Sequence, residues 1–163
     1  MSRLDSMIRR LSAQRDILNH VADELGLPAR GDILEIGLGN GRTYSHLRER
    51  FPGRRAIAFD RADLSHKSSS PDPADFVEGE IEETAEAFAG LEAALVHADI
   101  GTGYPDRDAV TLRWLPDLVA RLLAQGGIAV SGLPLEDARL TALPLPPGIA
   151  PDRYFLYRRE TSE

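Results

Sequence analysis

Cysteine is absent from this 163-residue sequence, and lysine occurs once, at Lys67. Without cysteine the chain has no disulfide bond, no thiolate nucleophile and no cysteine-ligated zinc. The single lysine lies in a stretch rich in serine and proline, so neither a Schiff-base lysine nor a phosphate-loop lysine is expected. The four histidines show no metal-ligand spacing, and no metal site is predicted.

Long hydrophobic runs are also missing. Charged residues interrupt the first ten positions, where a signal peptide would need an apolar core, and no run is long enough to span a membrane. These features predict a cytoplasmic protein with no membrane partner. The net charge of −7 disfavours a broad surface for nucleic acid, so nucleic acid is an unlikely partner by composition.

The length fits one compact domain, and no change of composition marks a boundary. We expect a single domain over residues 1–163, with an amphipathic helical segment, residues 1–27, packed on it. Buried strands are predicted at residues 32–36, 56–60, 75–77, 93–98 and 128–131, with helices at 42–51, 82–89 and 109–125. A loop at 62–75 replaces the usual crossover helix, and residues 154–159 predict an edge strand or hairpin.

This alternation of strands and helices is typical of an α/β fold. It predicts a Rossmann-like three-layer α/β/α sandwich with a mostly parallel sheet and an antiparallel edge at the C-terminus. In such sheets ligands bind beyond the carboxyl ends of the strands. The residues that follow the first four strands are therefore the candidates for a functional site.

A glycine-rich turn follows the first strand, in the sequence Glu35-Ile-Gly-Leu-Gly-Asn-Gly-Arg-Thr. Glycine permits a sharp turn and lets a ligand lie directly against the main chain. A dinucleotide fingerprint would need glycine where Arg42 stands, and that side chain would obstruct close packing of helix on strand. A turn that needs glycine for its geometry alone is the simpler alternative.

Carboxylates end two further strands. Asp60 closes the second strand, where it can accept hydrogen bonds from both hydroxyls of a ribose, although an aspartate that caps a turn is the common alternative. Asp99 ends the fourth strand in His97-Ala-Asp-Ile-Gly-Thr-Gly-Tyr. His97 precedes that strand end by two places, so we expect a hydrogen-bonded strand residue there rather than a catalytic base.

Glu35 and the glycine spacing resemble motif I of class I S-adenosylmethionine-dependent methyltransferases, Glu/Asp-x-Gly-x-Gly-x-Gly. The resemblance spans about residues 33–132, and the chain is also similar to a small bacterial group of such enzymes with an N-terminal Arg-Leu-Asp helix. It implies S-adenosylmethionine as cofactor, without naming a substrate. The cofactor-binding residues that it implies are Glu35, Gly37, Gly39, Gly41, Thr43, Asp60, Arg61, Glu80, Ile81 and Asp99.

The resemblance also implies roles for single residues. In Phe-Val-Glu-Gly-Glu-Ile, residues 76–81, Glu80 would meet the adenine amino group and Ile81 would cover the ring, although a solvated helix start is an equal alternative for Glu80. Asp99 would lie at motif IV, beside the sulfonium and the acceptor. An electronegative rim around the cationic cofactor would be formed by Glu35, Asp60, Glu80 and Asp99.

The first helix offers a further contact. Its arginines would reach the methionine carboxylate if the helix folds over the site, while a solvated face is the default for Arg3, Arg9 and Arg10. No general base is identified, and only Asp99 and Tyr104 are candidate catalytic residues.

Departures from the family's motifs narrow the acceptor. No Asn/Asp-Pro-Pro-Tyr follows the fourth strand, which disfavours methylation of nucleic-acid bases or glutamine. The fifth strand ends in Ser131-Gly132 rather than Asp-Asn, which disfavours the metal-dependent catechol type. Because no domain is appended to hold a macromolecule, we expect a small-molecule acceptor.

Two alternatives remain at this point. A NAD(P)-dependent reductase would share the sheet and Asp60, but the chain lacks the third glycine and any Tyr-x-x-x-Lys pair. The second alternative is a non-catalytic nucleotide-sensing or interaction protein, which would bind the cofactor without turnover. The short chain leaves little to cover a pocket, which predicts a homodimer whose partner subunit closes it.

Overall fold

Seven strands form one sheet in the order β3-β2-β1-β4-β5-β7-β6, in a computed structural model that describes residues 1–162. Five strands are parallel: β1 (Ile33–Ile36), β2 (Ala56–Asp60), β3 (Phe76–Glu78), β4 (Ala93–Ala98) and β5 (Leu123–Ser131). β7 (Phe155–Arg159) runs antiparallel to β5 and to the edge strand β6 (Leu140–Ala142). The predicted mostly parallel sheet with an antiparallel C-terminal edge is confirmed.

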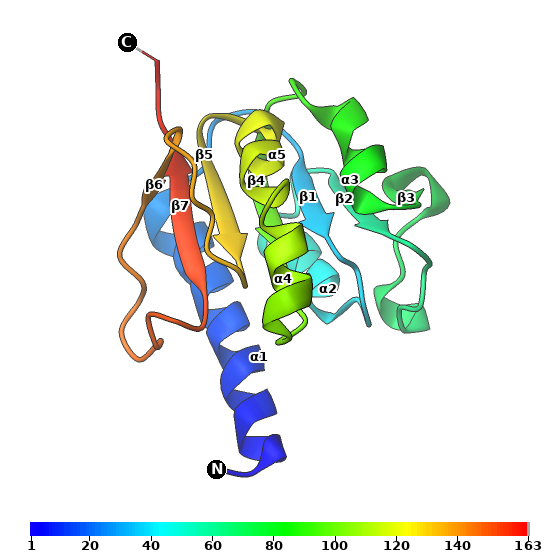
Figure 1. Cartoon of the computed structure of the whole chain (residues 1–163). Coiled ribbons are helices and arrows are strands. Elements are labelled where there is room, and N and C mark those ends of the chain that lie inside the picture. Colours follow the sequence, from blue (N-terminus) through cyan, green and yellow to red (C-terminus); the bar gives the residue numbers. More distant parts are fainter. Residues whose placement is uncertain (163) are drawn as a thin grey trace.

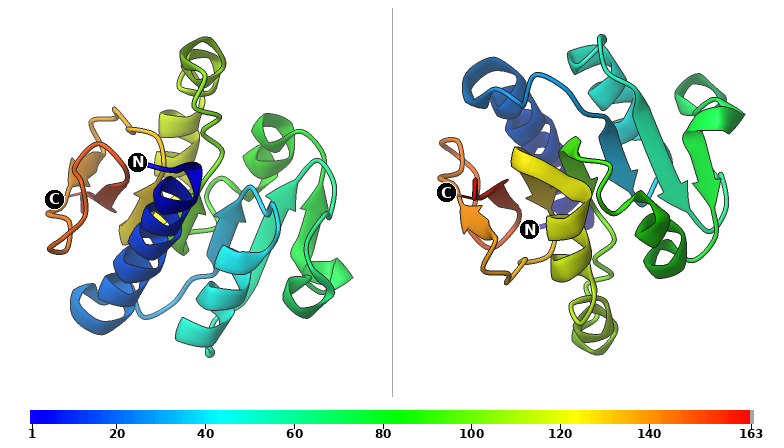
Figure 2. Two further views of the ribbon diagram at one scale, coloured as in Figure 1. Left: turned by 90° about the horizontal axis from the view of Figure 1, so that it is seen from below. Right: turned by 90° about the horizontal axis from the view of Figure 1, so that it is seen from above.

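Helices cover both faces of this sheet (Figures 1 and 2). On one face lie α1 (Arg3–His20), its π-helical continuation η1 (Val21–Leu25), and α2 (Arg42–Arg50). On the other face lie α3 (Ile81–Thr84), the 3₁₀ turn η4 (Ala85–Phe88) and α5 (Leu115–Leu122). The short helix α4 (Pro105–Thr111) follows β4 and lies on the same side of the sheet as α5, away from α1 (Figure 2).

Two apolar layers hold the helices to the sheet. Every residue of β1 and β4 is buried, as expected for parallel strands covered on both faces. Ile17 of α1 and Leu47 of α2 pack in one layer, while Leu118 of α5 packs in the other. The predicted segment 1–27 therefore lies against the sheet through the C-terminal part of α1.

The predicted helix at residues 109–125 is wrong at both ends and in the middle. The structure has α4, a turn at residues 112–114, and α5, while Leu123 already belongs to β5. Pro116 lies in the first turn of α5, where its missing N–H costs nothing, whereas inside a longer helix it would break the hydrogen-bond ladder. The amphipathic pattern correctly indicated α5, but it gave no sign of the turn that separates α5 from α4.

The connection after β2 is short, as expected. It holds only two 3₁₀ turns, η2 (Lys67–Ser69) and η3 (Pro73–Asp75). The backbone N–H of His66 donates to the carbonyl of Asn40 at 3.0 Å, which ties this loop to the glycine-rich turn. No helix within residues 1–162 is both long and apolar enough to cross a membrane.

Candidate cofactor-binding site

A cavity of about 1070 Å³ opens at the carboxyl ends of β1, β2 and β4, with α1 and α4 contributing to its wall. Its volume lies just above the usual range for small-molecule sites, about 300 to 1000 Å³. Nine of the predicted cofactor-binding residues line it: Gly37, Gly39, Gly41, Thr43, Asp60, Arg61, Glu80, Ile81 and Asp99. The fold thus brings together residues that lie up to 62 positions apart in the chain, from 37 to 99.

The glycine-rich turn combines packing and open space. Gly37 has a φ of +90°, and a Cβ there would meet Ile100 at 2.5 Å, so its glycine is required by the protein's own packing. Gly39 has a φ of +52°, yet a Cβ there would meet no heavy atom within 4 Å. Main chain is therefore exposed to the cavity at Gly39, as a ligand that lies against the turn requires.

Asp60 is tied to this turn through its carboxylate. Oδ2 accepts a hydrogen bond from the N–H of Gly39 at 3.0 Å, and Oδ1 accepts one from the N–H of Arg61 at 2.8 Å. A carboxylate has about four acceptor sites, so about two remain free. Asp60 thus caps the turn, which was the alternative role, and keeps capacity for two further donors.

The wall beyond Asp60 is charged and exposed. Arg61 Nε lies 3.0 Å from Glu80 Oε1, but the two side chains are 78% and 58% exposed. Such a surface pair contributes little to stability. Glu80 is the N-cap residue of α3, but its side chain makes no capping hydrogen bond. Ile81 is the first residue of α3 and lines the cavity.

Asp99 is held by the first helix. Its Oδ2 accepts hydrogen bonds from Arg10 at 2.7 Å and from Gln14 at 2.6 Å. Arg10 also donates through Nε to the hydroxyl of Tyr154 at 3.3 Å. Burial opposes the charge of Arg10, but the bond to Tyr154 and the carboxylate of Asp99 together raise the pKa of Arg10. Burial, with Asp99 adding to it, raises the pKa of Tyr154 to about 12.

The comparisons with known proteins identify the family. The sequence profile of a family described as S-adenosyl-L-methionine methyltransferase matches residues 1–159. The chain is a member of this family. It is a methyltransferase whose cofactor is S-adenosylmethionine, and the family assignment favours this function over the reductase and the non-catalytic alternative.

Solved structures agree with this assignment. An S-adenosyl-L-methionine methyl transferase from Silicibacter pomeroyi DSS-3 is 43% identical, with a TM-score of 0.86 over 98% of this chain and 99% of that one. A 1,6-didemethyltoxoflavin-N1-methyltransferase from Burkholderia thailandensis, solved with S-adenosylhomocysteine, is 18% identical, with a TM-score of 0.58 over 92% and 79% of the two chains. An rRNA methylase from Streptococcus thermophilus is 17% identical, with a TM-score of 0.53 over 93% and 97%.

The last two likenesses show the shared fold alone. No curated protein matches the methyltransferase. Within residues 1–162 no group of three or more histidine, aspartate or glutamate side chains is placed to hold a metal ion.

Glu35 is the one predicted cofactor residue that does not line the methyltransferase's cavity. Its side chain is 1% exposed and its Oε1 lies 2.6 Å from Nδ1 of His97 on the neighbouring strand. Burial raises the pKa of Glu35, against the effect of His97. Burial alone would lower the pKa of His97, but the carboxylate of Glu35 raises it. The two groups together hold a proton beneath the site, and His97 is a strand residue as expected.

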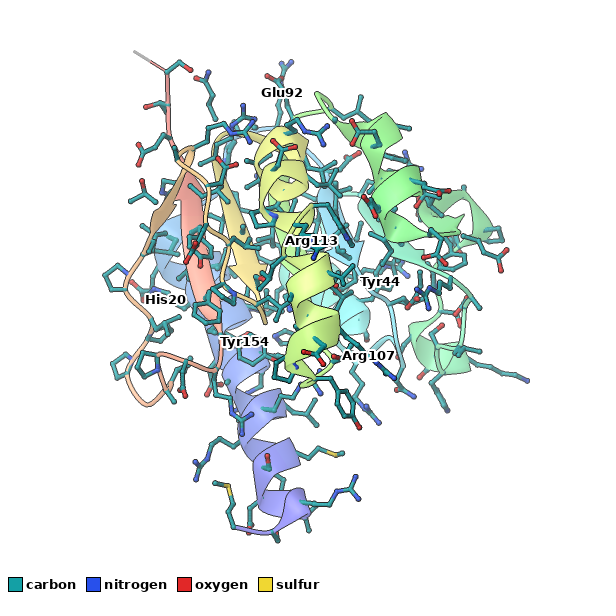
Figure 3. All side chains as sticks on the ribbon, in the orientation of Figure 1. His20, Tyr44, Glu92, Arg107, Arg113 and Tyr154 are labelled. Carbon is teal, nitrogen blue, oxygen red and sulfur yellow. The ribbon has the colours of Figure 1, made fainter. Side chains whose placement is uncertain are left out.

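Tyr104 also lies apart from the cavity wall. It is 63% exposed, and its ring centroid lies 5.0 Å from the guanidinium carbon of Arg107. Arg107 does line the cavity, from the first turn of α4 (Figure 3). Arg3 and Arg9 are exposed and do not line the cavity, so Arg10 is the only arginine of the predicted three that reaches the site.

Gln14, Arg107 and Trp114 are among the wall residues that sequence reasoning missed. Gln14 is only 5% exposed and occupies a position on the apolar side of α1, which is the signal that could have indicated a buried polar contact. Arg107 lies before the predicted helix at residues 109–125 and is placed by α4, which begins at Pro105. Trp114 lies inside the predicted helix, and the break between α4 and α5 was needed to place it.

Proposed function

We propose that this methyltransferase acts on a small-molecule acceptor and binds its cofactor across the carboxyl ends of β1, β2 and β4. The observation that carries the proposal is the single cavity that joins the open main chain at Gly39 to Asp60, Glu80 and Asp99. The adenosine part would lie between Asp60 and Ile81, and the amino-acid part would lie between Gly39 and Asp99.

The adenosine end is proposed to be held by Asp60, Glu80 and Ile81. The acceptor sites left on the Asp60 carboxylate suit the two ribose hydroxyls, and they lie next to the open main chain of Gly39. Ile81 offers an apolar surface for the adenine ring, and Glu80 offers an acceptor for its amino group. The exposed pair with Arg61 leaves Glu80 free to turn toward the ring.

The amino-acid end is proposed to use Arg10 and Asp99. A guanidinium and a carboxylate 2.7 Å apart present charges opposite to those of an α-carboxylate and an α-ammonium. Gln14 keeps Asp99 in place through a nearly buried amide. These three residues orient the end of the cofactor from which the methyl group departs.

The bound cofactor supplies an electrophilic methyl group on a sulfonium, which is already a good leaving group. The chain's own residues then need mainly to align the acceptor, and alignment of this kind contributes roughly 7 to 11 kcal/mol. Asp99 is paired with Arg10 and Gln14 through Oδ2, which suits a binding group better than a base. We therefore assign no general base, and the acceptor would supply its own nucleophilic atom.

The character of the wall supports a small acceptor. Carboxylates of Asp60, Glu80, Glu82, Glu83 and Asp99 line the cavity, and the whole chain carries a net charge of −7. The net charge of the chain repels a polyanion such as RNA, although Arg10, Arg42, Arg61 and Arg107 also line the cavity. Met7, Leu11 and Val110 add apolar surface between α1 and α4, where an acceptor would enter.

Labelled cofactor tests the proposal directly. The purified protein is incubated with methyl-labelled S-adenosylmethionine and with separate pools of small molecules, RNA and protein. Label should appear in the small-molecule pool and should be lost with Asp60→Ala. Label confined to RNA or protein would overturn the small-molecule acceptor.

A further inference from the structure

The N-terminal half of α1 carries an apolar stripe that nothing in the described chain covers. Leu4, Met7, Ile8 and Leu11 follow one another at helical spacing and are 66%, 59%, 54% and 37% exposed. Figure 1 shows these turns extending beyond the end of the sheet, past the rest of the molecule. Large exposed apolar patches on a soluble domain mark contact surfaces.

The helix is nevertheless built to be stable at this end. Ser2 and Asp5 form a complete capping box, in which the N–H of Asp5 donates to Ser2 Oγ and the N–H of Ser2 donates to Asp5 Oδ2. Arg153 also donates to Ser6 Oγ at 3.2 Å from the C-terminal region. A capped and anchored helix that displays an uncovered apolar stripe indicates a surface prepared for a partner.

We propose that this partner is a second copy of the chain, bound through an antiparallel pairing of the two α1 stripes about a two-fold axis between Met7 and Ile8. In that register Leu4 of each copy faces Leu11 of the other, so the surface is complementary to itself. The i,i+4 pair Asp5 and Arg9 lies along one side of the helix, and the antiparallel arrangement brings Asp5 of one copy toward Arg9 of the other.

The pairing completes the site as well as the surface. Met7 and Leu11 belong both to the stripe and to the cavity wall. Across the cavity, Val110 of α4 is another exposed apolar wall residue, at 54%. The second copy's helix would therefore cover apolar surface at the mouth and exclude water from the acceptor end. This consequence for catalysis rests on the proposed function, while the pairing itself does not.

A membrane surface is the other occupant that a stripe flanked by arginines could suit. Two features favour a second copy. Asp5 lies within the stripe's own segment, and the cavity beside it is lined by Glu82 and Glu83. The net charge of −7 on the whole chain weakens the attraction of the protein to an anionic bilayer, although this end of α1 carries Arg3 and Arg9 beside Asp5.

Light scattering coupled to gel filtration tests the pairing. The wild-type protein should have the mass of a dimer, and Leu4→Glu with Ile8→Glu should give a monomer with an unchanged circular dichroism spectrum, because both side chains are exposed. Leu91→Glu and Leu64→Glu place the same change on exposed leucines away from α1 and should leave the dimer intact. A wild-type monomer, or a dimer that survives the double change, would overturn the proposal.

The absence of cysteine allows a sharper test. A single Ile8→Cys change near the two-fold axis should yield a covalent dimer under mild oxidation, whereas Leu91→Cys should not. Equal cross-linking of both variants, or none with Ile8→Cys, counts against the antiparallel register. Flotation of a monomeric protein with phosphatidylserine vesicles would assign the stripe to a membrane instead and sink the dimer.

The two proposals fail separately. A dimer that transfers no label to small molecules keeps the pairing and overturns the acceptor class. A monomer that methylates a small molecule does the reverse. If both hold, the Leu4→Glu and Ile8→Glu double variant should bind S-adenosylhomocysteine in a thermal shift assay and lose at least tenfold in kcat/KM for the acceptor.

Discussion

The two ends of the cavity are built in different ways. At the end proposed to hold the adenosine, called the adenosine end, Gly39 and Asp60 follow or end adjacent parallel strands and are joined by a 3.0 Å hydrogen bond. At the end proposed to hold the amino-acid part, called the amino-acid end, Asp99 follows β4 and is held by Arg10 and Gln14, which lie 89 and 85 positions earlier in the chain. The first end depends on the sheet alone, whereas the second depends on how α1 docks. Changes at the two ends should therefore affect different ligands.

The largest effect is expected from Asp60→Ala. The change removes the acceptor proposed for two ribose hydroxyls, and each bond to a charged group contributes about 1.5 to 3 kcal/mol. Affinity for S-adenosylhomocysteine and for 5′-methylthioadenosine, which lacks the amino-acid part, should fall together in isothermal titration. Asp60→Asn keeps part of the acceptor capacity, so its affinity for both ligands should fall less than that of Asp60→Ala. An unaffected affinity for methylthioadenosine would show that Asp60 does not hold the ribose.

The buried pair beneath both ends should control stability rather than affinity. His97→Ala leaves the carboxylate of Glu35 buried without its partner, and loss of one member of a buried pair costs about 3 to 5 kcal/mol. Urea unfolding followed by circular dichroism measures this loss. The double change Glu35→Gln with His97→Ala removes the charge and should recover part of the stability. No recovery would mean that the cost comes from lost packing.

Arg10→Leu should separate the ends of the cavity. It removes one charge-assisted contact, so affinity for S-adenosylhomocysteine should fall by about 1.5 to 3 kcal/mol. Methylthioadenosine should bind as it does to the wild type, because it makes no contact at the amino-acid end. Arg9→Leu is the matched control on the same helix, and its cofactor affinity should not change. Equal losses for both ligands would show that α1 supports the whole cavity.

Stability should also depend on pH through His97. Its pKa is raised in the folded state, so the stabilising contribution is complete below the unfolded value of about 6.5 and is lost as the pH rises through the higher folded value. Tm measured from pH 6 upward should decline more steeply for the wild type than for His97→Gln. Parallel profiles would show that the pair does not titrate in this range.

The smallest effect is expected at Glu80. Its ion pair with Arg61 is exposed and contributes at most about 1 kcal/mol, so Glu80→Gln should leave the free energy of unfolding nearly unchanged. Affinity for adenosine ligands should fall slightly. The affinity for an inosine analogue, which lacks the amino group, should not change. An equal loss of affinity for both ligands would show that Glu80 does not contact the adenine amino group and is a solvated residue at the start of α3.

Much of the adenosine end was predictable, because it follows local rules. The strand, the glycine spacing and Asp60 place their chemistry at strand ends whatever the rest of the chain does. The amino-acid end was less predictable, because nothing in the sequence around Gln14 shows which strand end its side chain contacts. Pro116 was a visible signal against one helix at residues 109–125. The apolar periodicity of that segment nevertheless favoured a single helix.

The order of elements, the glycine-rich turn and the acids at the strand ends determined the family, the fold class and the cofactor. Tertiary structure alone decided that Glu35 turns away from the cavity to His97, that Arg10 and Gln14 hold Asp99, and that the stripe on α1 stays uncovered. Local patterns fix which residues reach a strand end, because backbone geometry is local. Which side chains meet there depends on docking between distant segments, which only the folded chain determines.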